Sequence, residues 1–226
     1  MPEIDTTLVL FCKPPSRSKQ RLVRELGARA TRELAERLLA CALEDAAGWR
    51  GPVVLSPAEP ADRAWARGLG LAAADIVAQA GGNLGGRLND IDSRLRDEGH
   101  GKLLFIGLDC PLLDRPALKT AAADLETADV ALGEAEDGGV VYMGNSRPWP
   151  DLTALPWSTA RLAYALAGAC REAGLSVESR GRWPDVDRTS DLSGLAPALA
   201  GDSRAARQRL RRWLLAGGDA ADRKVR

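Results

Sequence analysis

A run of cations follows the first apolar segment of the chain, residues 6–12. Lys13, Arg17, Lys19 and Arg21 lie within nine residues, at a point where we expect a helix to begin. Backbone amides at the start of a helix attract anions, Arg binds phosphate through paired hydrogen bonds, and Lys supplies a point charge. This spacing favours a phosphate-binding loop. The alternative is a solvated basic loop, because the segment matches neither a P-loop nor a Gly-x-Gly-x-x-Gly pattern.

Glycines and a cation also combine in GGNLGGRL, residues 81–88. Glycine allows a backbone to approach a ligand closely, and Arg87 would project from the first turn of the helix that follows. A flexible turn that leads into a helix explains the same residues equally well. The segment therefore supports a ligand site only together with others.

Acidic residues follow two further strand patterns. Asp109 comes directly after KLLFIGL, residues 102–108, where a carboxylate is costly unless it has a partner or a function. It could hold Mg²⁺ or Mn²⁺, which prefer oxygen ligands, or it could cap a helix or form a turn. In WPDVDRTSDL, residues 183–192, Asp185 and Asp187 lie one residue apart. On an extended segment both would point to the same side.

A third acidic segment, LGEAEDGG at residues 132–139, contains Glu134, Glu136 and Asp137 before two glycines. It is either a solvated turn or a loop that contacts a substrate. Taken together, cationic or glycine-rich segments and acidic segments follow the strands of one expected sheet. This combination predicts a site where a divalent ion and basic side chains bind the phosphates of a nucleoside di- or triphosphate.

Short apolar runs alternate along the chain with longer segments of helical periodicity. This alternation indicates βαβ crossovers and a single α/β domain with a mixed, mainly parallel sheet, whose ligands bind at the carboxyl ends of the strands. The predicted strands are residues 6–12, 52–56, 75–79, 102–108, 128–132, 140–144 and 175–179. The predicted helices are residues 29–47, 63–69, 84–98, 114–126 and 159–173, with two more towards the C-terminus.

Composition excludes several classes of protein. Lys+Arg and Asp+Glu both number 31, which gives no bulk attraction to nucleic acid or to acidic membranes. No apolar run approaches the roughly 18 residues of a membrane span, and acids precede the first apolar run, unlike a signal peptide. Four cysteines without a C-x-x-C pair and one histidine argue against a disulfide scaffold and a zinc site. We expect a cytoplasmic protein with small-molecule substrates, and the sequence does not define its oligomeric state.

Six segments in order resemble those of a bacterial family of GT-A-type glycosyltransferases linked to arsenosugar biosynthesis, also described as radical-SAM/selenodomain-associated transferases. The segments are FCKPP with KQRL, NLGGRL, IGLDCPLL, ALGEAEDGG, LPWST and DVDRTSDL, and they span residues 8–195. That family lies in the nucleotide-diphospho-sugar transferase superfamily. The resemblance implies one Rossmann-like, three-layer domain over residues 1–200, followed by a C-terminal helix and polar tail at residues 201–226.

The resemblance also implies roles for individual residues. Asp109 matches the superfamily's catalytic, metal-binding acid, and Asp187 matches a second acid that completes a site for Mg²⁺ or Mn²⁺. Glu136 or Asp137 would orient or deprotonate the acceptor. The residues that match the nucleotide and phosphate side are Lys13, Lys19, Arg21, Gly85 and Arg87. The residues that match the acceptor side are Gly138, Gly139, Trp157 and Thr159.

Two reactions are compatible with these motifs. The first is glycosyl transfer from a nucleoside-diphosphate sugar to a small acceptor. The alternative is nucleotidyl transfer, in which a phosphorylated acceptor attacks a nucleoside triphosphate and releases pyrophosphate. The short, glycine-free first loop favours the second reaction, because it is similar to that of guanylyltransferases that act on 2-phospholactate-like acids. A third hypothesis is an inert nucleotide-binding scaffold.

Overall fold

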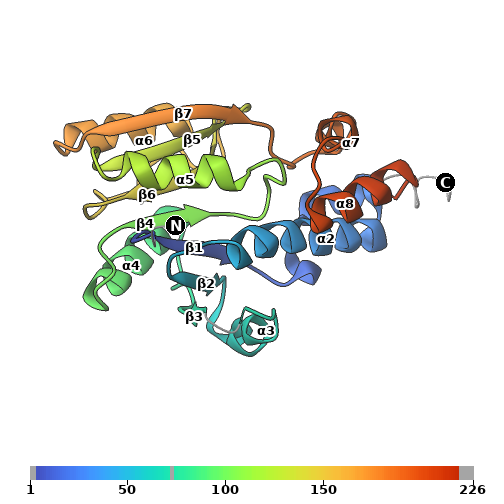
Figure 1. The fold of residues 1–226 in the computed structure, drawn as a ribbon, viewed down its shortest axis with the longest axis horizontal. Helices are drawn as coiled ribbons and strands as arrows, with labels where there is room; N and C mark the ends of the chain where they lie inside the picture. Colours follow the sequence, from blue (N-terminus) through green and yellow to red (C-terminus); the bar gives the residue numbers. More distant parts are fainter. Residues whose placement is uncertain (1–3, 72–73, 219–226) are drawn as a thin grey trace.

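A seven-stranded sheet forms the centre of the protein (Figure 1). The computed structural model describes residues 4–71 and 74–218. The strand order is β3-β2-β1-β4-β6-β5-β7, and β6 runs antiparallel to both of its neighbours while the other pairs are parallel. The strands are β1 Thr7–Cys12, β2 Val53–Pro57, β3 Asp75–Ile76, β4 Leu103–Ile106, β5 Val130–Ala135, β6 Val140–Asn145 and β7 Val177–Trp183. The prediction of a single α/β domain with a mixed, mainly parallel sheet is confirmed.

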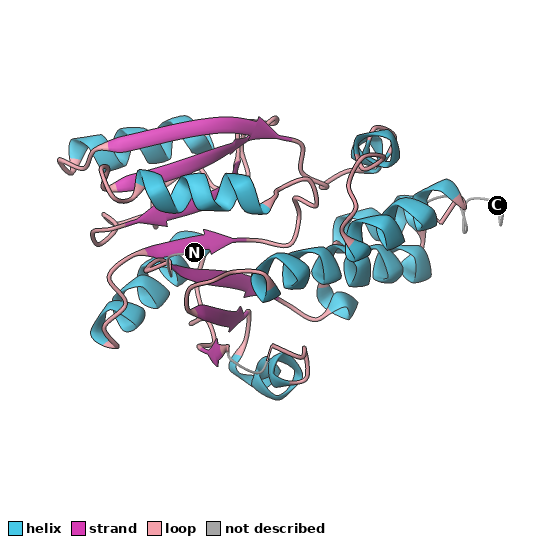
Figure 2. Ribbon diagram, viewed as in Figure 1, coloured by secondary structure: helices cyan, strands magenta, loops and turns pink. Residues whose placement is uncertain are grey.

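Helices cover both faces of this sheet and extend past its carboxyl ends (Figure 2). The α-helices are α1 Val23–Leu26, α2 Ala28–Ala47, α3 Arg63–Arg67, α4 Leu84–Asp97, α5 Arg115–Asp124, α6 Leu162–Glu172, α7 Leu195–Ala198 and α8 Ala205–Leu215. Short 3₁₀ turns are η1 Pro15–Arg17, η2 Gln20–Leu22, η3 Pro60–Asp62 and η4 Thr189–Leu192. None of the helices in the described part of the chain has the length and apolarity needed to cross a membrane.

Alternating side chains of the central strands build one core on each face of the sheet. Leu8 and Leu10 of β1 pack in a cluster with residues of α2 and α5, whereas Val9 packs in a cluster with residues of α4 and α6. All three side chains are fully buried, as expected for a parallel strand that is covered on both sides. The result is a three-layer arrangement that fixes the carboxyl ends of β1 and β4.

A third apolar cluster lies beyond the carboxyl ends of the strands. It joins α1 and α2 to α7 and α8, through side chains such as Leu26, Leu34, Leu195 and Leu210. In Figure 1, α8 lies alongside α2, and the arrowheads of β1, β4 and β7 point towards this end of the molecule. The third cluster therefore packs α7 and α8 against α1 and α2.

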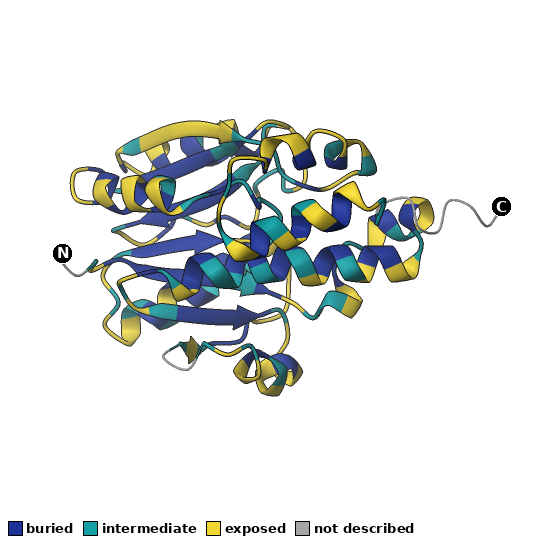
Figure 3. Ribbon diagram, turned by 45° about the vertical axis from the view of Figure 1, so that its right-hand side comes forward, coloured by how far each residue is buried: buried dark blue, intermediate teal, exposed yellow. Residues whose placement is uncertain are grey.

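Several predicted elements differ in extent from the observed ones. The strand predicted at residues 128–132 continues through Gly133 and Glu134, where its pairing with both neighbours shifts in register. The strand predicted at residues 175–179 becomes the longer β7, an edge strand whose central residues are exposed (Figure 3). Residues 178–182 are polar or glycine and lack the apolar pattern of a buried strand, so the periodicity predicted a strand that ends too early.

The basic segment does not lead directly into one long helix. It forms η1 and η2, then the short α1, and Gly27 with φ of +80° separates α1 from α2. Lys19 also has a positive φ of 52°, which is uncommon for a residue with a side chain. The backbone between β1 and α2 is thus a compact series of turns that brings its cations to the carboxyl end of the sheet.

Candidate functional site

The loops that follow β1 and β4 lie side by side, because these strands are hydrogen-bonded neighbours. The strand order reverses between them, and open α/β sheets bind ligands at the carboxyl side of such a switch point. A cavity of about 540 Å³, here called the basic cavity, lies at this position. Its lining includes the charged residues Lys13, Arg17, Lys19, Arg21, Arg87, Asp109 and Asp187.

Lys19 joins the two acids that were expected to bind a metal. Its Nζ lies 2.7 Å from Asp109 Oδ1 and 2.9 Å from Asp187 Oδ1, and it also donates a hydrogen bond to Val186 O. The Lys19 side chain is 8% exposed, whereas the two carboxylates are 49% and 46% exposed. The structure thus brings Asp109 and Asp187 together beside the basic loop, with an ammonium group between them.

These ion pairs shift the pKa values of the groups that form them. Burial lowers the pKa of Lys19, but the attraction of Asp109 and Asp187 outweighs burial, so the pKa is raised overall. Burial raises the pKa of Asp187, but Lys19 and, more weakly, Arg21 and Lys13 bring it below its usual range. At neutral pH, Lys19 is therefore a cation and Asp187 an anion.

The remaining cations of the basic cavity are not equivalent. Arg17 lies 2.5 Å from Glu59 and also pairs with Asp62. Within residues 4–71 and 74–218, Lys13, Arg21 and Arg87 form no ion pair. Arg87 donates through Nε to Gly82 O at 2.9 Å. These three side chains, rather than Arg17, are the ones whose charge is available to an anion in the cavity.

Gly85, which was expected on the nucleotide side, is buried in the first turn of α4. A Cβ at this position would lie 2.1 Å from Leu152 O and 2.8 Å from Trp157 Nε1. The glycine thereby allows the first turn of α4, which Asn83 caps, to approach the loop that precedes α6. This close packing holds α4 in the position from which Arg87 reaches the basic cavity.

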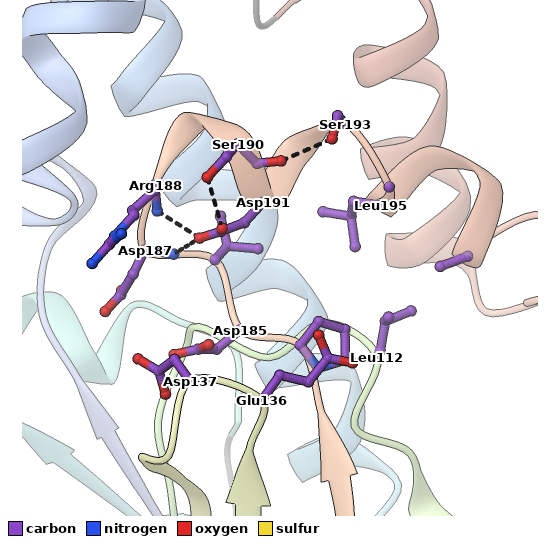
Figure 4. A pocket seen from close by; sticks show the side chains of 14 residues that line it. Leu112, Glu136, Asp137, Asp185, Asp187, Arg188, Ser190, Asp191, Ser193 and Leu195 are labelled. Carbon is purple, nitrogen blue, oxygen red and sulfur yellow. Dashed lines mark hydrogen bonds between the residues drawn. The ribbon is translucent and has the colours of Figure 1, made fainter. Parts of the chain in front are cut away.

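A second cavity of about 530 Å³, here called the acidic cavity, adjoins the first at Asp187, which lines both. Figure 4 shows the carboxylates of Asp137 and Asp185 next to each other, with Glu136 on the same wall. Burial, together with the charges of Asp137 and Asp187, raises the pKa of Asp185 to about 6. Arg188 contributes a cation to the lining.

The segment after β7 is held in place by its own side chains. Asp191 accepts hydrogen bonds from the backbone N of Asp187 at 2.8 Å and of Arg188 at 2.6 Å (Figure 4). Val186 is buried between Asp185 and Asp187, both of which line the acidic cavity. As expected for an extended segment, Asp185 and Asp187 line the same cavity. Their neighbours differ, because Asp187 pairs with Lys19 whereas Asp185 lies beside Asp137.

The residues expected on the acceptor side make their contacts mainly within the chain. Gly138, with φ of +89°, shapes the turn between β5 and β6, and the Gly139 N donates to Asp137 Oδ1 at 2.9 Å. Trp157 Nε1 donates to Leu152 O at 2.9 Å, and Thr159 Oγ1 donates to Pro156 O at 2.7 Å. These four residues shape their own loops, and Glu136 and Asp137, directly before Gly138, line the acidic cavity.

Ser158 and Asp185 are among the lining residues that the predicted site did not include. Ser158 lines the basic cavity with a positive φ of 60°, and no local pattern in LPWST indicated that conformation. Asp185 was visible in the sequence as one of two nearby acids, but its position beside Asp137 depends on the pairing of β5 with β7. Both placements arise from contacts between segments that are distant in the sequence.

The side chains at this point supply only some of the ligands that a divalent ion needs. In the described portions of the chain, no group of three or more His, Cys, Asp or Glu side chains is arranged to bind a metal. Asp109 and Asp187 nevertheless place two carboxylate oxygens within 2.9 Å of one point, the Lys19 nitrogen. Mg²⁺ commonly uses one or two carboxylates plus water and substrate phosphates. The residues therefore fit Mg²⁺ or Mn²⁺ bound together with a nucleotide.

Solved structures share this fold. A candidate nucleotide-diphospho-sugar transferase from Desulfovibrio desulfuricans G20 is 22% identical, with a TM-score of 0.84 over 95% of this chain and 98% of the other. The 4-diphosphocytidyl-2C-methyl-D-erythritol synthase of Anaerococcus prevotii DSM 20548 is 8% identical, with a TM-score of 0.51 over 93% and 96%. Rv0371c from Mycobacterium tuberculosis H37Rv, in complex with manganese, is 17% identical, with a TM-score of 0.50 over 83% and 95%.

Sequence comparison identifies the family. None of the curated proteins matches this chain significantly. The family model described as "Uncharacterized protein conserved in bacteria (DUF2064)" matches residues 33–159. That match extends from α2 through the loops of Arg87, Asp109 and Asp137 to Thr159, and it covers more than half of the chain. The chain therefore belongs to the DUF2064 family.

Proposed function

We propose that this protein is a transferase that moves a sugar from a nucleoside-diphosphate donor to a hydroxyl group of a small acceptor. The observation that carries the proposal is the junction of two cavities of opposite charge at Asp187. The basic cavity offers cations to a diphosphate, and the acidic cavity offers hydrogen-bond acceptors to hydroxyl groups. The shared fold with a candidate nucleotide-diphospho-sugar transferase supports the same reaction class.

In this proposal the donor diphosphate lies in the basic cavity. Lys13, Arg21 and Arg87 bind its phosphates, because their charges are not committed to other side chains of the described protein. Asp109 and Asp187 would hold Mg²⁺ or Mn²⁺, which neutralises phosphate charge and stabilises the leaving nucleoside diphosphate when bound. In the nucleotide-free protein Lys19 pairs with both carboxylates, so the ion would displace its ammonium group, which then adds a positive charge to the basic cavity.

The acceptor in this proposal is a neutral or cationic molecule with a hydroxyl group. Glu136, Asp137 and Asp185 line the acidic cavity and can accept hydrogen bonds from hydroxyls. Glu136 or Asp137 orients the reacting hydroxyl and takes its proton as the oxygen attacks the anomeric carbon and the nucleoside diphosphate departs. A phosphorylated acceptor would meet like charges on this wall, and such contacts are destabilising.

The acidic wall therefore favours glycosyl transfer over nucleotidyl transfer to a phosphorylated acceptor. One observation supports nucleotidyl transfer: Lys13, Lys19, Arg21 and Arg87 all line a single cavity. Three of these cations form no ion pair with a described residue, and Lys19 adds a fourth charge if a metal ion takes its place between Asp109 and Asp187, which suits a triphosphate better than a diphosphate. Nucleotidyl transfer with release of pyrophosphate is thus the second candidate, and its phosphorylated acceptor would have to bind away from Glu136, Asp137 and Asp185.

All four cysteines are free, which suits a reducing compartment such as the cytoplasm.

The two reactions are separated by a direct comparison of products. The protein is incubated with Mn²⁺ and a panel of UDP- and GDP-sugars, and the release of nucleoside diphosphate is measured. In parallel, pyrophosphate release is measured with the four nucleoside triphosphates. Turnover of a sugar donor supports the proposal, and pyrophosphate release alone supports the second candidate. A nucleotide that binds at 100 times its Kd stabilises the folded protein by about 2.7 kcal/mol and therefore raises the melting temperature. If neither reaction occurs and no nucleotide with Mn²⁺ raises the melting temperature, the proposal fails.

A further inference from the structure

Arg207 lies in α8, outside both cavities, yet its side chain is fully buried. Its guanidinium donates to Pro111 O at 3.1 Å and to Leu113 O at 3.2 Å. On α2 it donates to Cys41 O at 2.5 Å and pairs with the carboxylate of Asp45. One buried side chain therefore connects the C-terminal helix and α2 to the segment directly after Asp109.

That segment has little regular structure of its own. Between the end of β4 and the start of α5 the chain forms no helix or strand, and Asp109 lies in this segment, just before a turn at residues 111–112. Asp109 O accepts a hydrogen bond from Val186 N at 2.8 Å, so the same segment also fixes the loop that carries Asp187. A displacement at Pro111 and Leu113 would be transmitted to both carboxylates that meet at Lys19.

We propose that Arg207 is a positioning residue that sets the separation of Asp109 and Asp187 by clamping the turns at residues 110–113. The inference rests on the proposed function for its effect on nucleotide binding. Arg is suited to this position because its planar guanidinium carries five donors in a fixed geometry, whereas Lys has a single ammonium group. One Lys nitrogen cannot replace donors aimed at Pro111, Leu113 and Cys41 at once.

Stability alone does not explain why an Arg is buried at this position. Replacing a buried ion pair by apolar residues of similar volume is often neutral or stabilising, and α8 already packs through Leu210 and Trp213. Arg204 contributes a parallel contact, since its Nη1 donates to Leu113 O at 3.2 Å and to Asp45 Oδ1 at 2.7 Å. Arg207 of α8 and Arg204, which directly precedes α8, thus both donate to Leu113 O.

The test compares three variants with the wild-type protein at a temperature where all are folded. Arg207→Met removes the donors while Asp45 keeps Arg204 as a partner. Arg207→Lys retains the charge. Leu210→Ala removes fully buried apolar volume from the same helix and serves as the matched control for lost stability. Backbone amide exchange is measured at Leu113 and Val186, and the Mn²⁺ complexes of UDP and GDP are titrated by calorimetry.

We expect Arg207→Met and Arg207→Lys to bind the Mn²⁺–nucleotide complex about 10- to 100-fold more weakly than the wild type, the range found when residues that support metal ligands are lost. The exchange of the Leu113 and Val186 amides should become about tenfold faster. Leu210→Ala should lower the melting temperature but leave the affinity within about twofold.

Three outcomes would overturn the inference. The first is unchanged exchange at both amides in the Arg207 variants, and the second is unchanged nucleotide affinity in a folded variant of Arg207. The third is an equal loss of affinity in Leu210→Ala, because Arg207 would then contribute only stability. If the wild type binds neither nucleotide, that result counts against the proposed function, and amide exchange still decides the role of Arg207. If Arg207→Met does not fold, Arg207→Lys provides the same comparison.

Discussion

Replacing Lys19 by Met removes the ammonium group between Asp109 and Asp187 and keeps a long, unbranched side chain in its place. In the wild-type protein a divalent ion must compete with this ammonium group for the two carboxylates. We therefore expect the K19M protein without nucleotide to bind Mn²⁺ more tightly than the wild type does. The same variant should bind nucleotide phosphates more weakly, because Lys19 also lines the basic cavity.

The magnitude follows from the geometry of the ion pairs. Two unit charges 4 Å apart interact by about 1 kcal/mol in water and by about 4 kcal/mol at an effective dielectric constant of 20. The Lys19 contacts are shorter, at 2.7 and 2.9 Å, but both carboxylates are about half exposed. We take about 1–2 kcal/mol as the competition that the ammonium group provides, since water screens the exposed oxygens. This energy corresponds to an increase in Mn²⁺ affinity of roughly 5- to 30-fold.

The assay titrates Mn²⁺ into nucleotide-free protein and follows the spin-resonance signal of the free ion. R87M is the matched control, because it removes one positive charge from the same cavity and Arg87 has no ion pair with a described residue. R87M should change Mn²⁺ affinity by less than K19M does. An affinity of K19M for Mn²⁺ equal to or lower than that of the wild type would show that the two carboxylates are not a cation site from which Lys19 excludes metal.

Three further changes test other parts of the structure. Gly85→Ala should destabilise the protein by about 1–3 kcal/mol in urea unfolding, because its Cβ would meet Leu152 O at 2.1 Å; Gly86→Ala, whose nearest contacts are at 3.6 Å, is the control and should not destabilise. Asp109→Asn should abolish Mn²⁺-dependent turnover while circular dichroism stays that of the wild type, and retained activity would exclude Asp109 from the metal site. Asp114→Ala should cost about 0.5–2 kcal/mol in thermal unfolding, because Asp114 Oδ1 caps α5 by accepting from Ala117 N at 2.8 Å.

The position of the candidate site could be predicted from local sequence patterns. Apolar runs such as residues 102–108 identify buried strands, and parallel strands bring their carboxyl ends to one edge of a sheet. Cations after β1 and acids after β4 and β7 were therefore expected near one another, and the observed cavities contain Lys13, Asp109 and Asp187. This reasoning needs only the order of the elements and the direction of the strands.

Side-chain roles were harder to predict, because they depend on partners that are distant in the sequence. Gly85 was expected on the nucleotide side, and the sequence did not indicate that a Cβ there would lie 2.1 Å from Leu152 O. Arg17 looked equivalent to the other cations of its loop, but Glu59 and Asp62 pair with it. Spacing along the chain describes which residues share a loop, and it does not describe what approaches that loop from elsewhere.

Periodicity and composition within short segments were enough to predict the α/β class, the alternation of elements and the charge of each loop. Only the folded chain shows that Lys19 lies between Asp109 and Asp187 and that Arg207 reaches the turn after Asp109. Hydrogen bonds and ion pairs depend on distance and direction in space, and both are set by contacts between segments that are far apart in the sequence.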